Sequence, residues 1–423
     1  MKIKHWKRDS CRLCSSNRLE KVLDLKAVPI GEKYSLHPFN EEPQRYPIDL
    51  YNCKECFCIQ VLDNIDQDFL WSEYTYFSGQ TNSIINHQED FAEYVVNNFT
   101  FSKKPKILDI GSNDGTLLKA FEKNGFGIFG VDPADTVAKV AREQGVETLV
   151  ALFSDKIIEE IPSKFRELDL ITAFNVFAHS DDMSGMIKGV SQLLKPEGMF
   201  CFEVQYLVPV LDKKLLGTIF HEHMIHYSVT SANNFMESNG FKIIDIRFNN
   251  IQKGSVIFYV VKDSNLMAVD PIVEETLEYE RINGYLDGTK FKDFSQYISN
   301  TRDKISLLKD RIKIERSVIC GYGAARSGPT LAVQFGLENI ISYLIDDHPS
   351  KCGKFAPFES LEVKSSESIQ EAKPDYIVIL AWIHTKNIII NNRDYLSNGG
   401  TIIALWPKYR EITNENYDQW LNE

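Results

Sequence analysis

The sequence predicts an α/β protein whose middle domain is built on a doubly wound parallel sheet, with a small cysteine-rich domain before it and a second doubly wound domain after it. Two observations support this prediction. Apolar runs bounded by glycine alternate with helical stretches in the middle of the chain and again near its end, which is the pattern of βαβ units. Five of the eight cysteines fall between Cys11 and Cys58, so the first segment needs its own explanation.

Length and composition limit the class of protein. The chain has 423 residues, of which 43% are hydrophobic and 25% charged, and its formal net charge is -12. This is ordinary globular composition with room for more than one domain. The negative charge argues against binding of nucleic acid polymers, and no apolar stretch approaches the ~20 residues of a membrane span. The basic amino-terminal segment lacks the apolar run of a secretion signal, so we expect a cytoplasmic protein that is a monomer or a small homo-oligomer.

Pattern and composition divide the chain into three blocks. Residues 1–68 hold the clustered cysteines and are predicted to form a zinc-binding domain. Residues 69–265 contain PKILDIG, FGIFGVD, LDLITAFNV and GMFCFEV, predicted as parallel strands, followed by FKIIDIRF and GSVIFYVV, predicted as an antiparallel pair at the sheet edge. Residues 266–423 begin with charged helical sequence and continue with SVICGYGAARSG, IISYLIDD, PDYIVILAW and GGTIIALWP. We expect connecting helices there, followed by the second α/β domain.

Two C-x2-C pairs in the first block predict a metal site. Each pair can place two thiolates on one ion, and two pairs complete the tetrahedral four-sulfur shell that zinc prefers in a structural site. The expected ligands are Cys11, Cys14, Cys53 and Cys56, with Cys58 as a spare able to substitute for one of them. Iron–sulfur ligation, or reduced cysteines packed as small apolar side chains, are the alternatives.

A glycine-containing loop follows the first predicted strand of the middle block. In PKILDIGSNDG the strand of about 105–110 leads into a loop where the backbone can approach a ligand at the carboxyl edge of the sheet. The candidate cofactor-binding residues of this loop are Asp109, Gly111, Asn113, Asp114 and Gly115. Their spacing, Asp-x-Gly-x-x-x-Gly, resembles the first motif of class I S-adenosylmethionine (SAM) methyltransferases.

The next predicted strand, in FGIFGVDP, ends in Asp132. A carboxylate at this position can accept hydrogen bonds from both hydroxyls of a ribose. Together with the glycine loop, Asp132 favours SAM over a nicotinamide cofactor.

Two more segments are expected near the same sheet edge. FNVFAHSDD places Asn175 and His179 after the fourth strand, where His179 is a candidate for orienting a substrate or transferring a proton. WSEYTYFSGQTN is a candidate lid over the cofactor through Tyr74 and Tyr76, with aromatic packing as the alternative.

The segment GTIFHEHMIHYS concentrates ionisable side chains. It contains His221, Glu222, His223 and His226 but lacks the HExxH spacing of a catalytic zinc site. Neighbouring imidazole and carboxylate groups can create a base whose pKa is near the operating pH. We therefore expect acid–base chemistry here; the alternative is a polar loop with incidental histidines.

The last block contains the loop GYGAARSG between a predicted strand and helix. The third glycine of a G-x-G-x-x-G loop is replaced by Arg326, so the sequence does not favour a nicotinamide site. Arg326 and the helix amides could hold a phosphate or carboxylate, or the loop is only a packing turn. The sequence leaves both interpretations open.

Taken in order, CRLC, CKEC, YTYFSGQTN, DIGSNDG, NVFAH, FEVQYL, FHEH and GYGAARSG are similar to the motifs of nucleotide-sugar C-methyltransferases. The chain resembles the deoxysugar C-3-methyltransferases over nearly its whole length. The resemblance implies a zinc-binding domain, a central Rossmann-like SAM-binding domain and a C-terminal Rossmann-like domain that helps hold a nucleotide sugar. It also implies His223 as the base, with Glu222 and His179 in the active site. The residue before HEH, often Tyr in that family, is Phe220 here, which leaves the sugar and the methylated atom open.

The reaction implied by the resemblance is base-catalysed C-methylation of a 4-keto sugar. A base removes the acidic hydrogen next to the ketone, and the enolate carbon displaces the methyl group of SAM. We expect His223 to be the base, Glu222 to orient it or raise its pKa, and His179 to position the substrate or face the enolate. Two alternative hypotheses are O- or N-methyl transfer to a related sugar or small metabolite, and a non-catalytic scaffold that binds zinc and a nucleotide.

Overall fold

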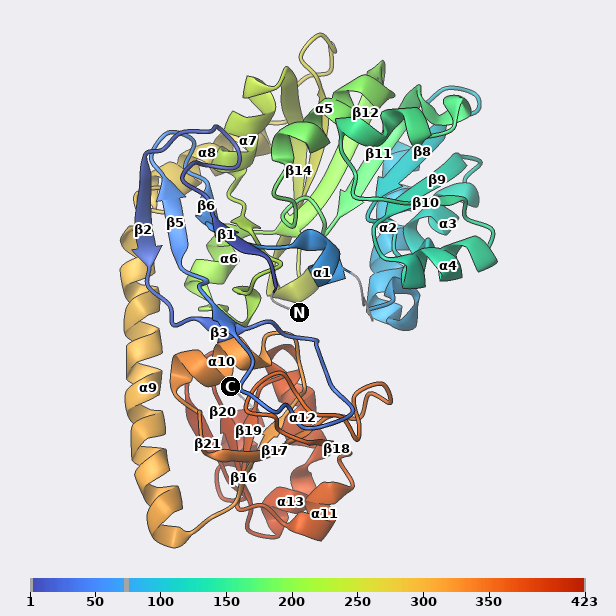
Figure 1. Cartoon of the computed structure of the whole chain (residues 1–423). Coiled ribbons are helices and arrows are strands. Elements are labelled where there is room, and N and C mark those ends of the chain that lie inside the picture. The colour runs from blue at the N-terminus through green and yellow to red at the C-terminus, as the bar shows by residue number, and fades with distance from the viewer. Residues whose placement is uncertain (1–2, 72–75, 422–423) are drawn as a thin grey trace. The chain divides into compact units, whose positions relative to one another are not determined.

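The computed structural model describes residues 3–71 and 76–421 (Figure 1). The chain divides into two compact units, each built from segments that are not contiguous in sequence. Unit 1 contains Met1–Glu20, Asn52–Leu207 and Met224–Leu286, and unit 2 contains Lys21–Tyr51, Val208–His223 and Asp287–Glu423. Each unit holds a mostly parallel sheet with helices, which confirms the predicted fold class. Each of the three predicted blocks is one continuous stretch of sequence, whereas each compact unit combines three separate stretches. The predicted block boundaries are therefore not tested by this division and stay a prediction.

The main sheet of unit 1 has seven strands in the order β10-β9-β8-β11-β12-β15-β14. Its strands are β8 (Lys106–Ile110), β9 (Gly127–Asp132), β10 (Thr148–Val150), β11 (Leu168–Phe174), β12 (Leu194–Gln205), β14 (Phe241–Asn249) and β15 (Ser255–Lys262). The first five pair in parallel, in the Rossmann-type order 3-2-1-4-5. β15 is antiparallel to both β12 and β14, so the predicted antiparallel pair at the sheet edge is confirmed.

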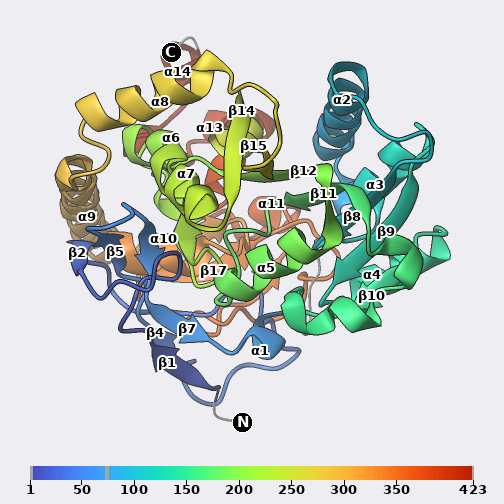
Figure 2. The same ribbon diagram turned by 90° about the horizontal axis from the view of Figure 1, so that it is seen from above.

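Helices cover this sheet because its strands are apolar on both faces. Six of the seven residues of β11 are buried, as expected for a strand with helices on either side. On one face, Phe91 and Val95 of α2 and Leu118 of α3 share a core with Ile107, and Figure 2 shows α2 beside α3. The helices of unit 1 are α1 (Gln67–Trp71), α2 (Asn82–Asn98), α3 (Thr116–Glu122), α4 (Asp135–Glu143), α5 (Met183–Leu193), α7 (Val229–Ser238) and α8 (Pro271–Ile282), with short 3-10 helices at Ser78–Gln80, Asp155–Glu160, Ser163–Phe165 and Ile251–Lys253.

The cysteine-rich segment consists of short strands. β1 (His5–Lys7) pairs with β7 (Asp63–Ile65), and β13 (Ile225–His226) pairs with β6 (Ile59–Val61), both antiparallel. A four-stranded sheet has the order β13-β6-β5-β2. The chain passes from one unit to the other within β2 (Leu19–Leu23) and β5 (Leu50–Cys53).

Unit 2 repeats the doubly wound arrangement, which confirms the predicted second α/β domain. Its six-stranded sheet has the order β18-β17-β16-β19-β20-β21, with β21 antiparallel at one edge. The strands are β16 (Ile319–Tyr322), β17 (Ile341–Ile345), β18 (Val363–Lys364), β19 (Tyr376–Ile379), β20 (Thr401–Ala404) and β21 (Arg410–Ile412), and a separate pair joins β3 (Val28–Pro29) to β4 (Arg45–Tyr46).

The long helix α9 (Thr289–Glu315) lies against α10 (Gly328–Phe335) in unit 2 (Figure 1). Its buried side chains recur every three or four residues, from Phe291 to Ile312, so one stripe of the helix faces the core. The other helices are α6 (Leu207–Asp212), α11 (Ser368–Ala372), α12 (Thr385–Asn391), α13 (Arg393–Ser397) and α14 (Tyr417–Leu421), with single turns at Leu216–Thr218 and Trp382–His384. Across residues 3–71 and 76–421, no helix is both long and apolar enough to cross a bilayer.

Candidate functional site

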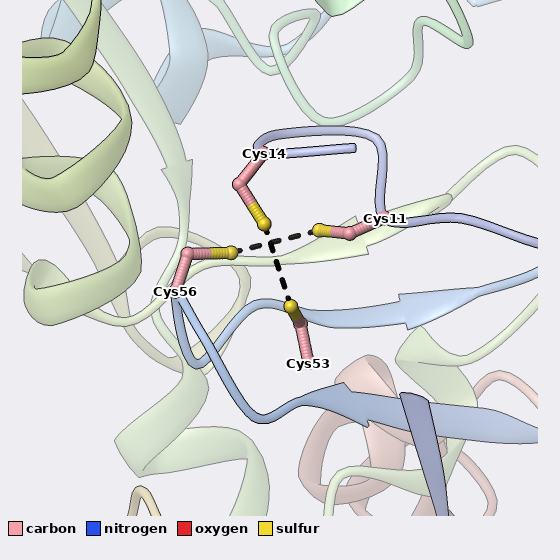
Figure 3. Close-up of side chains that lie close together, drawn as sticks. All are labelled: Cys11, Cys14, Cys53 and Cys56. Carbon is pink, nitrogen blue, oxygen red and sulfur yellow. Dashed lines mark hydrogen bonds between the residues drawn. The ribbon is translucent and has the colours of Figure 1, made fainter. Parts of the chain in front are cut away.

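Four cysteine thiols meet in unit 1 (Figure 3). The Sγ atoms of Cys11, Cys14, Cys53 and Cys56 all lie within 4.8 Å of one another. The Sγ atoms of Cys11 and Cys56 are 3.5 Å apart, as are those of Cys14 and Cys53. A tetrahedral site with Zn–S bonds of about 2.3 Å has S···S distances of about 3.8 Å. The sulfur positions therefore fit one zinc ion, and the spare predicted from the sequence, Cys58, is not part of the group.

The two C-x2-C pairs have the same local backbone structure. In each, the residue after the second cysteine has a left-handed φ of 60°, Ser15 in one and Phe57 in the other. Its N–H donates to the carbonyl of the first cysteine, at 3.0 Å in the Cys11 turn and 2.9 Å in the Cys53 turn. The N–H of that first cysteine donates to the carbonyl five residues ahead, at 2.8 and 3.0 Å. The thiols are thus positioned by backbone turns of the kind that suits a structural metal site.

The glycine loop after β8 lies at the carboxyl edge of the main sheet of unit 1. Gly111 has a φ of +69°, and a Cβ there would lie 2.2 Å from Cγ2 of Val176. Gly115 has a φ of +82° and directly precedes α3. Only glycine satisfies both the backbone angle and the close contact at Gly111, so the chain stays close to the sheet before it enters the helix.

The side chains of Asn113 and Asp114 hold the segment that leads into α2. Asn113 accepts from the N–H of Ser78 at 3.0 Å and donates to the carbonyl of Tyr76 at 3.0 Å. Asp114 accepts from the N–H of Gly79 at 2.8 Å. The described part of the predicted lid is therefore attached to the glycine loop, and Tyr74 lies outside the described residues.

Two buried carboxyl groups flank the loop. Asp132, at the end of β9, accepts from the N–H groups of Asn113 at 2.9 Å and Ala134 at 2.8 Å. Burial raises the pKa of Asp132 to about 6, and these two N–H groups oppose the rise. Burial also raises the pKa of Asp109 to about 7, opposed by the hydroxyl of Thr172, which donates to it at 2.6 Å. Burial therefore disfavours the charged form of both carboxyl groups, and hydrogen bonds from within the protein partly stabilise it.

Asn175 and His179 follow β11 in the same unit. Asn175 has a left-handed φ of 56°, which asparagine tolerates better than most residues, and its N–H donates to the carbonyl of Glu203 at 2.8 Å. The ring of His179 stacks on Trp71, with centroids 5.7 Å apart. Met224, which follows His223 in the chain, donates its N–H to the carbonyl of Ala178 at 3.1 Å.

The FHEH segment belongs to unit 2. Nδ1 of His223 lies 2.7 Å from the carbonyl oxygen of Thr218. Because a carbonyl can only accept, Nδ1 is the protonated nitrogen, and Nε2 carries the lone pair of the neutral ring. Burial, together with the charge of Arg326, lowers the pKa of His223 to about 4, although the hydrogen bond to the Thr218 carbonyl opposes this change. This shift is opposite to the rise that was one of the two roles expected of Glu222, and the other role, orienting His223, stays a prediction. The Phe220 ring, 4.0 Å away between centroids, adds apolar surroundings.

Glu222 lies beside the second glycine loop, in the same unit. Its Oε1 is 3.4 Å from Nη1 of Arg326, and both side chains are mostly buried. Burial raises the pKa of Glu222, and the charge of Arg326 opposes this rise. Thr330 of α10 donates to the carbonyl of Ile219 at 3.0 Å. The loop before α10 therefore supports the FHEH segment through one ion pair and one hydrogen bond. The carboxylate beside Arg326 belongs to the chain itself, so binding of a ligand anion by this loop stays a prediction.

The second glycine loop is occupied by the chain itself. A Cβ at Gly31 would lie 2.4 Å from the carbonyl oxygen of Arg326, and the hydroxyl of Tyr34 donates to the carbonyl of Ala324 at 2.7 Å. Asp346, at the position where a dinucleotide ribose would bind, accepts from the N–H of Ala324 at 2.9 Å. These contacts agree with the absence of the third glycine and do not fit a nicotinamide dinucleotide.

Comparisons with known proteins cover almost the whole chain. Family models match as a zinc binding domain at residues 11–71, a methyltransferase domain at 85–246 and a C-methyltransferase C-terminal domain at 250–407. C-methyltransferase NovU of Streptomyces niveus is 30% identical over 410 residues, which are 96% of this chain and 98% of NovU. The chain belongs to this C-methyltransferase family.

More distant relatives match a part of the chain. A ubiquinone biosynthesis O-methyltransferase of Coxiella burnetii is 26% identical over 167 residues, covering 36% of this chain and 70% of that protein. Among solved structures, the PH0226 protein of Pyrococcus horikoshii is 17% identical with a TM-score of 0.37, covering 47% of this chain and 99% of that one. The magnesium protoporphyrin IX methyltransferase of Synechocystis, solved with bound SAH, is 15% identical with a TM-score of 0.34, covering 46% and 91%.

This member of the C-methyltransferase family is a SAM-dependent enzyme with a zinc-binding domain. The family assignment removes the scaffold hypothesis. Sequence reasoning missed one interaction of the FHEH segment, because Arg326 is 104 residues from Glu222. It also did not single out Glu203 in FEVQYL, a fully buried carboxylate that faces His87; the signal available was a charged residue within an apolar strand.

Proposed function

We propose that this C-methyltransferase methylates the carbon next to the ketone of a nucleotide-linked 4-keto-deoxysugar, at C-3. A methyl group can be transferred to a saturated carbon only after that carbon has become nucleophilic, and a neighbouring ketone makes its hydrogen acidic enough for a side chain to remove. The order of motifs along the chain supports the sugar substrate, since it resembles that of deoxysugar C-3-methyltransferases.

The observation that carries the proposal is the state of His223. Its Nδ1–H donates a hydrogen bond to the carbonyl of Thr218, and the pKa of His223 is lowered to about 4. The ring is therefore neutral at physiological pH, with the lone pair on Nε2 ready to accept a proton. When Nε2 takes the proton from the sugar carbon, the Thr218 carbonyl accepts a hydrogen bond from the resulting imidazolium, and the electron pair of the C–H bond passes into the enolate.

Two other ionisable residues have supporting roles in the proposal. Glu222, held by Arg326, helps to orient the substrate and compensates the charge that forms on His223. His179, stacked on Trp71, positions the sugar or donates to the enolate oxygen. Because Phe220 has no hydroxyl, the chain relies on these groups rather than on a phenol.

SAM supplies the electrophilic methyl group when it is bound to unit 1. Asp132 is proposed to accept from the ribose hydroxyls, since each of its oxygens keeps a second lone pair besides the bond to a backbone N–H. Asp109, Gly111, Asn113, Asp114 and Gly115 are proposed to form the loop under the cofactor, with Asn175 and Tyr76 beside it. The reacting carbon and the methyl group must lie about 3–3.5 Å apart for in-line transfer.

The proposal is tested with nucleotide-linked 4-keto-deoxysugars in D2O. Wild-type enzyme with S-adenosylhomocysteine is expected to exchange the hydrogen at C-3 for deuterium, and with SAM to add a methyl group there. His223→Asn is expected to lose both reactions while its affinity for SAM is unchanged. His37→Asn, the same change at an exposed histidine, serves as the control and retains both. Methyl transfer to an oxygen without exchange, or full exchange by the His223 variant, would contradict the proposal.

A further inference from the structure

A second histidine–carboxylate pair lies in unit 1 and has no role in the chemistry above. Glu203 is 0% exposed at the carboxyl end of β12. Its Oε1 accepts from Nδ2 of Asn249 at 2.7 Å, and its Oε2 lies 2.9 Å from Nε2 of His87. Both carboxylate oxygens therefore face donors, as a buried charge requires.

The pair is located at the sheet edge that carries the glycine loop. Glu203 pairs in register with Phe174 of β11, the residue before Asn175. The His87 ring lies 6.1 Å from the Phe174 ring, between centroids. His87 is in the second turn of α2, and the segment before that helix is attached to Asn113. His87 is thus held near the ends of β11 and β12, in the unit that binds SAM.

The environment of His87 favours its charged form. Burial alone would lower the pKa of His87, but the hydrogen bond to Glu203 and the charges of Glu203 and Asp90 raise it above its ordinary value. In the imidazolium both ring nitrogens are donors. Nε2 is used by Glu203, and within residues 3–71 and 76–421 Nδ1 has no hydrogen-bond partner. The side chain of His87 is 15% exposed whereas that of Glu203 is 0% exposed, so a ligand can reach only the histidine.

A purely structural role explains this arrangement less well. An apolar pair would join α2 to β12 at no electrostatic cost, whereas a buried ion pair often gives no net stabilisation over well-packed apolar side chains. A carboxylate that fixes the orientation of a histidine ring is a common support for an imidazole that contacts a ligand. We propose that His87, oriented by Glu203, donates from Nδ1 to an anionic oxygen of a ligand at this edge of the sheet. Two such oxygens belong to the reaction: the carboxylate of the methionine part of SAM and the oxyanion of the enolised acceptor.

The two sources are separated by measuring binding and exchange on the full chain. His87→Gln keeps a neutral amide donor on the helix, and His37→Gln is the matched control on an exposed histidine. Affinity is measured for S-adenosylhomocysteine, which has the carboxylate, and for 5′-methylthioadenosine, which lacks the whole amino acid portion. If His87 holds the carboxylate, His87→Gln weakens S-adenosylhomocysteine binding at least tenfold and leaves 5′-methylthioadenosine binding unchanged. If His87 holds the enolate, both affinities are unchanged and the deuterium exchange rate falls at least tenfold.

The carboxylate result does not depend on the proposed sugar substrate, whereas the enolate result rests on the proposed function. If the proposed sugar is not the substrate, the wild-type enzyme shows no deuterium exchange on it. The comparison of S-adenosylhomocysteine with 5′-methylthioadenosine can still be made in that case. The proposal for His87 is overturned if folded His87→Gln matches wild type in both affinities and in exchange, or if it weakens both nucleosides equally. Glu203→Gln, which removes the charge but keeps the shape, is expected to reproduce the selective loss.

Discussion

Replacing Arg326 by methionine is expected to shift the pH dependence of the reaction. The Arg326 guanidinium is 3.4 Å from the Glu222 carboxylate, and a charge at this distance changes the pKa of a carboxyl group by about 1–3 units. The side chain of Arg326 is 21% exposed, so water weakens its interaction with Glu222. We therefore expect an effect at the lower end of this range, about one pH unit, which corresponds to about 1.4 kcal/mol. Arg326 also lowers the pKa of His223.

Removal of Arg326 is expected to raise the pKa of both Glu222 and His223. Arg326 opposes the burial that raises the pKa of Glu222, so its removal lets that pKa rise further. It adds to the burial that lowers the pKa of His223, so its removal raises that pKa from about 4. Both groups are proposed to act in their unprotonated forms. Arg326→Met should therefore move the acid limb of the pH profile of kcat/KM to higher pH by about one unit.

The assay is methyl transfer measured across the acid limb in wild type, Arg326→Met and Arg326→Lys. The lysine variant keeps the charge and is expected to shift the limb less than the methionine variant. If Arg326 only binds an anionic part of the substrate, kcat/KM falls equally at every pH and the limb stays in place. A folded methionine variant whose limb coincides with that of wild type would refute the electrostatic reasoning.

Two further predictions concern stability and metal content. Cys56→Ser should lose zinc and lower the Tm, because the four-sulfur site loses one ligand. Zinc analysis and thermal unfolding test this, with Cys352→Ser, which lies outside the cluster, as the control. A Cys56 variant that still carries a full complement of zinc would contradict the prediction. Glu280→Gln should reduce the free energy of unfolding by about 2–4 kcal/mol, because buried Glu280 accepts from the Tyr206 hydroxyl, from the N–H groups of Val229 and Thr230 and from the Thr230 hydroxyl. Denaturant unfolding measures the change, and a loss below about 0.5 kcal/mol would show that an amide serves equally well.

The sequence alone predicts the features that depend on short segments. Strand runs, the glycine loop, Asp132 and the two C-x2-C pairs are each defined within a dozen residues, and the structure has them where the pattern indicates. It does not predict that Lys21–Tyr51 joins unit 2. There, Gln334 donates to the carbonyl of Lys26 at 2.6 Å and accepts from its N–H at 2.9 Å. In sequence, Gln334 is only a polar residue in an apolar helix, and its partner is 308 residues away.

The two histidines show why local sequence could suggest candidates but not protonation states. His223 adjoins Glu222 in the chain, which suggests a raised pKa, yet burial and distant Arg326 lower it. Asp90 lies three residues after His87 in the chain, but the carboxylate that bonds the ring and contributes most to raising the pKa of His87 is Glu203, 116 residues away. The two environments shift the pKa values of two identical side chains in opposite directions. The histidine with the lowered pKa is suited to accept a proton, and the one with the raised pKa is suited to donate a hydrogen bond. If both proposals hold, one neutral histidine creates the negative charge of the reaction, and a charged one stabilises an anionic oxygen.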